Sequence, residues 1–187
     1  ISASDSGFAC RVSNTTGVQA LTTSDGLAVT AIAPLQLNSL TGGIVQSLMA
    51  FEGVAKIQQI TGDAAFGNLS MNALPTATGT FSPLSNCSTE RRMAFISPEG
   101  LRMIDFTGTV SSPIGDHGEG VSVPFIFAPH PSRICAAARA DTLRVSPGSQ
   151  EFWFDLTRRI WSGPHSFPAS LIQPWRASFV VAPVAVA

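Results

Sequence analysis

Turn-forming residues divide this chain into short segments and leave little room for long helices. The sequence contains 16 Gly and 13 Pro, with Ser, Thr and Asn between them. No stretch of a dozen residues holds the 3.6-residue apolar period of an amphipathic helix, and apolar runs of strand length alternate with turn signals. The best helix candidate, residues 43–52, is short and bracketed by glycines, so we predict a strand there. The chain is therefore predicted to be all-β, with little helix beyond single turns.

The clearest local signal is a β-hairpin over residues 92–106. Two β-prone runs, residues 93–96 and 101–104, are joined by the tetrapeptide Ser-Pro-Glu-Gly. Its proline suits the first central position of a type I turn, and its glycine suits the left-handed backbone that follows. A third run, residues 107–114, follows as expected of a meander.

A second unit with four strands is predicted over residues 133–161. The expected strands are residues 134–138, 142–145, 151–154 and 159–161. Four strands in about thirty residues is the rhythm of a β-propeller blade. Four more candidates precede this unit, at residues 27–37, 45–51, 54–61 and 68–78.

These strands predict propeller-like blades of antiparallel meanders. At roughly 40–45 residues per blade the chain would hold about four blades, too few to close a ring comfortably. We therefore expect an incomplete propeller. The expected organisation is an irregular strand-rich segment over residues 1–44, a blade region over residues 45–170, and the start of a further strand or a linker over residues 171–187.

The charge content is low. Charged residues make up 12% of the sequence, about half the usual share of roughly 25%, and the formal net charge is −1. One explanation is a soluble domain with a surface rich in Ser and Thr. The explanation we favour is a surface largely buried against other subunits. No stripe of Lys or Arg stands out, which disfavours non-specific binding of nucleic acid.

The cysteine pattern and the apolar runs argue against a disulfide scaffold, a zinc site and a membrane-spanning helix. The three cysteines, Cys10, Cys87 and Cys135, fit neither a disulfide framework nor a zinc-ligand pattern. No cofactor is expected. No apolar run is long enough for a membrane-spanning helix, and the first residues lack the regions of a signal peptide. Because the chain starts without Met and stops within an apolar run, we expect a fragment of a longer polypeptide.

Three stretches resemble a known family. They are ITGD at residues 60–63 with TGT at 78–80, MAFISPEGLRMIDF at 93–106, and QEFWFD at 150–155 running to WSGPH at 161–165. In this order they resemble the propeller portion of bacteriophage virion proteins, in particular the tail nozzle or tail tubular protein B-like proteins of short-tailed phages.

The resemblance covers roughly residues 45–170. It implies a structural protein of the virion tail, assembled in the host cytoplasm as a ring of copies, expected to be a hexamer. It also implies a channel through which double-stranded DNA passes without specific binding, and contacts to neighbouring tail proteins such as the adaptor and fibres.

The polar cluster at residues 115–120 is the first candidate for a chemical site. Asp116, His117 and Glu119 could bind a divalent cation, or the histidine could act as a base. Flanking glycines favour instead an exposed connecting loop. We therefore expect that substituting any of the three leaves biological activity nearly intact.

Other catalytic arrangements find little support, and we do not expect an enzyme. His130 and His165 lie beside prolines, and the chain has no G-x-S-x-G elbow. Sialidases use a tyrosine nucleophile, and this chain contains no Tyr. The remaining carboxylates fall at predicted strand ends or turns, where Asp commonly caps the backbone; they are Asp63, Asp105, Asp141 and Asp155.

The three tryptophans leave a second class of function open. Trp153, Trp161 and Trp175 could form a sugar-stacking surface, although the first two lie in one hairpin and are better explained as core. The alternative to a structural virion protein is thus a propeller that recognises a host glycan or a partner tail protein. On the structural hypothesis, the chain alone is not a stable monomer, and Trp161→Ala costs about 3–5 kcal/mol.

Overall fold

The computed structural model describes most of the chain as antiparallel β-sheet. It describes residues 2–4, 7–14, 17–22, 26–38, 43–62, 68–89, 92–114, 125 and 128–184, with side chains from residue 26 onward except that of residue 38. Helical backbone within these ranges is found in the 3-10 turn Pro131–Arg133 and at Phe125. The predicted all-β class is confirmed.

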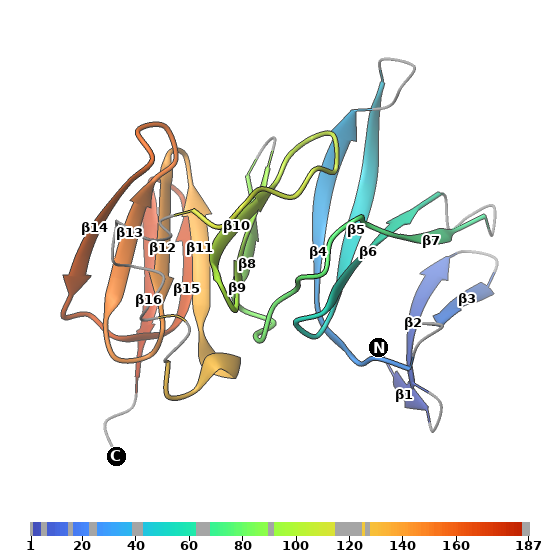
Figure 1. The fold of residues 1–187 in the computed structure, drawn as a ribbon, viewed down its shortest axis with the longest axis horizontal. Coiled ribbons are helices and arrows are strands. Elements are labelled where there is room, and N and C mark those ends of the chain that lie inside the picture. Colours follow the sequence, from blue (N-terminus) through green and yellow to red (C-terminus); the bar gives the residue numbers. More distant parts are fainter. Residues whose placement is uncertain are drawn as a thin grey trace.

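The described strands form five antiparallel sheets (Figure 1). The first contains β1 (Ser2–Ser4), β2 (Gly7–Asn14) and β3 (Gly17–Thr22). The second contains β4 (Val29–Asn38), β5 (Ile44–Glu52), β6 (Lys56–Thr61) and β7 (Ser70–Ala73). The third contains β8 (Asn86–Ser88), β9 (Met93–Ser97) and β10 (Gly100–Ile104). The fourth contains β11 (Cys135–Arg139), β12 (Thr142–Ser146), β13 (Glu151–Asp155) and β14 (Ile160–His165). The fifth contains β15 (Ala169–Trp175) and β16 (Ser178–Pro183).

The two clearest sequence signals are confirmed as local structure. Strands β9 and β10 form the expected hairpin, with Ser97 paired to Gly100 and the glycine at a φ of +134°. Strands β11 to β14 follow one another in the order predicted for residues 133–161. The left-handed backbone of Ala140, at a φ of +48°, turns β11 into β12.

One predicted strand is interrupted. Residues 107–114 pair with β10 through two isolated bridges, Ile104 to Val110 and Leu101 to Ile114, and Ser111 between them exchanges hydrogen bonds with Met103 through its N–H and its hydroxyl. The physical reason is a tight turn at the start of this segment. The Asp105 carboxylate accepts hydrogen bonds from the backbone N–H groups of Thr107 and Thr109, which would otherwise be available for pairing with a neighbouring strand.

The four earlier candidates correspond to β4 through β7, and β4 pairs with β5 on either side of residues 39–42.

The second to fifth sheets follow one another, and the first strand of each contacts the first strand of the next. Strand β4 contacts β8, β8 contacts β11, and β11 contacts β15. In each of these sheets the first strand lies at one edge, and the later strands continue away from it in sequence order. This succession is compatible with consecutive blades of an incomplete propeller.

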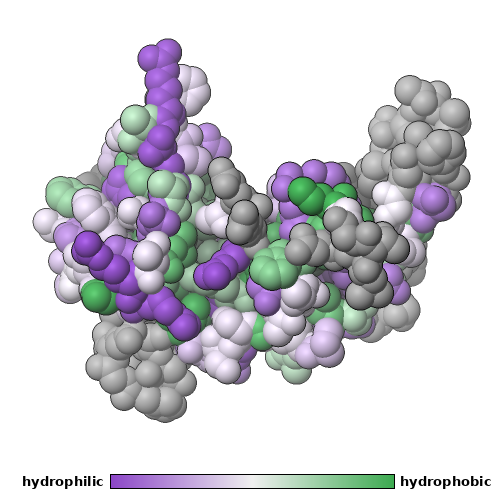
Figure 2. All heavy atoms as spheres, turned by 90° about the horizontal axis from the view of Figure 1, so that it is seen from above, coloured by the Kyte–Doolittle hydropathy of each residue, from purple (hydrophilic) through white to green (hydrophobic). Residues whose placement is uncertain are grey.

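Apolar cores lie between neighbouring sheets. One core joins the second and third sheets, with the rings of Phe51 and Phe95 at 5.2 Å between centroids. Another joins the third and fourth sheets and includes Leu101, Leu143 and Phe154. A smaller one joins the fourth and fifth sheets. On the outside, hydrophilic and hydrophobic residues are interspersed, with hydrophilic patches over the C-terminal sheets (Figure 2).

Trp161 provides a test of the core between the third and fourth sheets. Its ring lies 4.7 Å from that of Phe154 and 5.8 Å from that of Phe125, but the residue is only half-buried. We expect Trp161→Ala to lower the free energy of unfolding by about 3 kcal/mol, the low end of the range for a large aromatic. Urea denaturation at fixed protein concentration measures this. Trp175→Ala is the control, since Trp175 is 62% exposed; equal effects of the two substitutions would contradict the assignment.

Candidate functional site

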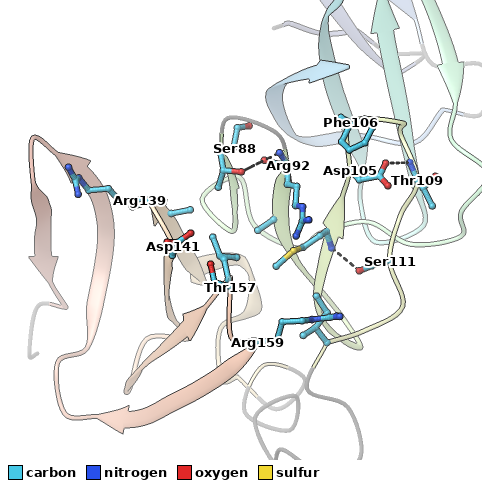
Figure 3. Close-up of a pocket in the computed structure, with 17 residues that line it drawn as sticks. Ser88, Arg92, Asp105, Phe106, Thr109, Ser111, Arg139, Asp141, Thr157 and Arg159 are labelled. Atoms are coloured by element: carbon cyan, nitrogen blue, oxygen red, sulfur yellow. Dashed lines mark hydrogen bonds between the residues drawn. The ribbon is translucent and has the colours of Figure 1, made fainter. Parts of the chain in front are cut away.

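A cleft between the third and fourth sheets is the best candidate for a binding site. It has a volume of roughly 1120 Å³ and lies where loops from both sheets meet (Figure 3). One wall comes from the residues between β8 and β9 and those after β10, and the other from the β11–β12 and β13–β14 turns. Its apolar lining comprises Ala94, Met103, Phe106, Ile114, Ala138, Ala140 and Leu156.

The Asp105 turn shapes one wall of the cleft. The Asp105 Oδ1 atom accepts hydrogen bonds from Thr107 N at 2.8 Å, Thr107 Oγ1 at 2.5 Å and Thr109 N at 3.1 Å. Partial burial acts to raise the pKa of Asp105, but these bonds and the nearby Arg92 charge outweigh it, so the pKa lies below its usual range. Asp105 is therefore an ionised turn cap. The interpretation of strand-end aspartates as backbone caps is confirmed for Asp105 and is wrong for Asp141, whose carboxylate accepts no hydrogen bond from a described residue.

The opposite wall is set by two left-handed residues. Ala140 and Arg159 have φ angles of +48° and +58°, which close the β11–β12 and β13–β14 turns. The Asp141 carbonyl accepts a hydrogen bond from Leu156 N at 2.7 Å and so ties the two turns together. Asp155 caps the second turn, since its Oδ1 accepts bonds from Thr157 N and Arg158 N at 2.9 and 2.8 Å.

Five charged residues line the cleft, and their charges do not cancel. Arg92, Arg139 and Arg159 line it together with two carboxylates, Asp105 and Asp141, which leaves one net positive charge. Arg139 Nε donates to the Arg176 carbonyl. The guanidinium of Arg92 points into the cleft and that of Arg159 lies on the opposite wall (Figure 3). Neither of these two guanidinium groups donates a hydrogen bond to another described residue.

The structure describes only some of the residues considered for chemistry: Asp116, His117 and Glu119 lie outside the described residues, as does Asp63. Of the described ones, Asp105 and Asp141 line the same cleft. His130 is exposed before the 3-10 turn. Across the described ranges, no group of three or more His, Cys, Asp or Glu side chains could hold a metal ion.

The tryptophans do not form a shared platform. Trp161 pairs with Phe154 across β13 and β14 and so shares its face, whereas Trp153 is paired with Ser162 and points to the other face. There the Trp153 ring packs on His165 at 4.6 Å. The core explanation holds for Trp161, while Trp175 is exposed on β15.

A buried ion pair behind Trp153 was not predicted from the sequence. Arg144 donates to both carboxylate oxygens of Glu151, with Nη2 to Oε2 at 2.7 Å, and Trp153 Nε1 donates to Oε1 at 2.5 Å. Glu151 is fully buried. The Arg144 guanidinium lies over the rings of Trp153 and Phe179, at 5.2 and 5.1 Å, so the pair also connects the fourth sheet to the fifth. The sequence feature that could have indicated this ion pair is Arg144, a charged residue between two apolar strand residues, Leu143 and Val145.

The two described cysteines are expected to be unreactive in the folded chain. Burial raises the pKa of the Cys87 thiol to about 12. Burial, and then repulsion by the Glu151 charge, raises the pKa of Cys135 to about 11. Because only the thiolate reacts, we expect both to be alkylated by iodoacetamide at pH 8 far more slowly in the native chain than in urea. Mass spectrometry of the labelled peptides measures the rates; equal rates in both conditions would contradict the burial of the thiols.

Comparison with known proteins adds no family to this description. The chain matches no protein-family model and no curated protein sequence. In the part of the chain that the structure describes, no helix has the length and apolar character required to cross a membrane.

Proposed function

We propose that this chain is a structural component of a bacteriophage tail, forming part of the nozzle or tube through which the genome is ejected. The observation that carries the proposal is the succession of sheets with touching first strands, β4, β8, β11 and β15. Such a succession suits a wall built by repeated blade-to-blade packing. The phage assignment itself rests on the resemblance of residues 60–63, 78–80, 93–106 and 150–165 to tail proteins.

The fifth sheet carries an apolar outer face that supports assembly. Strand register puts Leu171, Trp175 and Val180 on one face of β15 and β16, away from Ile172 and its core. These three side chains are 38%, 62% and 56% exposed. A two-stranded sheet with such a face gains stability when another surface covers it. Copies of the same polypeptide in a ring, expected to be a hexamer, would supply that cover.

The charge distribution suits a conduit. With 11 basic and 12 acidic residues, the chain has no large positive field to retain double-stranded DNA. DNA would therefore pass without specific binding, while the remaining partners would be neighbouring tail proteins such as the adaptor and fibres. The location that follows is the virion tail.

Electron microscopy and hydrodynamics test the proposal. We expect residues 1–187 to associate at micromolar concentration and to form rings with a central opening in negative stain. Trp175→Glu should weaken association, because it puts a charge on the apolar face of β15, whereas Val54→Glu, in the exposed turn between β5 and β6, is the control. A monodisperse monomer that is unaffected by Trp175→Glu would contradict the structural role.

A second candidate is a recognition module for a host glycan or a partner tail protein. The observation that favours it is the cleft between the third and fourth sheets, where two arginines without hydrogen-bond partners among the described residues face solvent. This role is compatible with a position in a tail, and its ligand class is inferred next.

A further inference from the structure

We propose that the cleft between the third and fourth sheets binds the carboxylate of an acidic sugar, held between Arg92 and Arg159. The inference rests on the second candidate function, glycan recognition, and is independent of the structural role. Both arginines line the cleft from opposite walls, Arg92 before β9 and Arg159 before β14. A group bound between them would contact both sheets.

The two guanidinium groups are chemically suited to a carboxylate. Arginine presents its N–H donors as a planar fork that matches the two oxygens of a carboxylate. Arg92 and Arg159 donate no side-chain hydrogen bonds to described residues, so a ligand would break none, although the Arg92 charge already acts on nearby Asp105. Neighbouring Arg158, by contrast, lies outside the cleft lining and is 3.9 Å from Asp155.

The balance of charge favours a single carboxylate over a polyanion. Asp105 and Asp141 line the same cleft and balance the charges of Arg92 and Arg159, so that the third lining arginine, Arg139, leaves one net positive charge. Asp105 is held ionised by the hydrogen bonds of its own turn. A nucleic acid or a strongly acidic peptide would bring several negative charges against these two aspartates, and that repulsion disfavours both.

The rest of the lining favours a sugar as the carrier of the carboxylate. The Asp141 carboxylate accepts no hydrogen bond from a described residue and is available to sugar hydroxyls, as is the hydroxyl of Thr157 beside it (Figure 3). Phe106, 40% exposed, offers an apolar ring at the edge of the cleft. Ten of the seventeen residues that line the cleft are polar or charged, and such a lining suits a ligand rich in hydroxyl groups.

Calorimetric titration of the full 187-residue chain tests the inference. The probes are sialyllactose, its neutral methyl ester, a glucuronate-containing tetrasaccharide, lactose and a tetra-aspartate peptide. We expect at least one of the two acidic sugars to bind, and the neutral ester or lactose to bind roughly ten-fold or more weakly. Which acidic sugar binds identifies the source of the carboxylate. Tighter binding of the peptide than of either acidic sugar would overturn the choice of a saccharide.

Variants test the two arginines separately. Arg92→Gln and Arg159→Gln are each expected to weaken binding of the acidic sugar roughly ten-fold, and Arg158→Gln is expected to leave it unchanged. Arg92→Lys should bind the acidic sugar more tightly than Arg92→Gln but more weakly than the unsubstituted chain, because lysine keeps the positive charge without the planar pair of N–H donors. Thermal melting checks that every variant folds. If neutral and acidic sugars bind equally and the variants have no effect, glycan recognition stands and the carboxylate site is wrong. If no sugar binds, glycan recognition fails as well, while the assembly experiments are unaffected.

Discussion

Glu151→Ala is expected to lower the free energy of unfolding by about 3–5 kcal/mol. Glu151 is fully buried and receives both the Arg144 guanidinium and the Trp153 indole N–H. Removing the carboxylate leaves a guanidinium that is only 14% exposed without its counter-charge, and also leaves the indole N–H unsatisfied. Because Arg144 also contacts Phe179 on β16, the contact between the fourth and fifth sheets should weaken too.

Urea denaturation at a fixed protein concentration measures this loss, since association would otherwise change the apparent stability. Glu99→Ala is the matched control, because Glu99 pairs with Arg102 through a side chain that is 56% exposed. That pair should contribute no more than about 1 kcal/mol. The double variant Arg144→Met/Glu151→Leu should recover much of the stability, as an apolar replacement of a buried pair often does. Equal losses for Glu99→Ala and Glu151→Ala would show that burial of the pair does not matter.

Gly79→Ala is expected to destabilise the chain by about 3 kcal/mol or to prevent its folding. A Cβ atom on Gly79 would lie 2.1 Å from the carbonyl oxygen of Gly53, a backbone atom that cannot turn aside. The same oxygen accepts the 2.8 Å hydrogen bond from Thr80 N that fixes the connection between the second and third sheets. The added methyl must therefore displace backbone and break this bond, combining overpacking with a lost hydrogen bond.

Circular dichroism during thermal unfolding measures this effect. Gly43→Ala is the control, because a Cβ there meets nothing within 4 Å and the residue is exposed. Its effect should stay within about 0.5 kcal/mol. An unchanged melting temperature for Gly79→Ala would mean that the approach of residue 79 to the Gly53 turn is not tight in solution.

The predictions from sequence succeeded where the signal was local. The hairpin of β9 and β10 and the four strands of β11 to β14 depend on turn residues and on short apolar runs that neighbour one another in the chain. The turn caps Asp105 and Asp155 belong to the same class, because each bonds backbone groups within a few residues. The interrupted segment after β10 shows the limit, since a side-chain cap competed with strand pairing.

The candidate site could not be predicted in this way. Arg92 and Arg159 lie in loops that belong to different sheets, and their common cleft exists only because β8 packs against β11. Likewise, the sequence shows Glu151 only as a polar residue at the start of a predicted apolar strand. Its burial is explained by the packing of the fifth sheet on the fourth.

The sequence by itself determined the class of fold: frequent turn residues and strand-length apolar runs restrict the chain to short antiparallel strands, because these signals act on neighbouring residues. Only the tertiary structure decided which sheets touch, which charges are buried and where a cleft opens. Those features depend on contacts between residues far apart in the chain, where the side-chain pattern of any one strand carries no information about its neighbour in space.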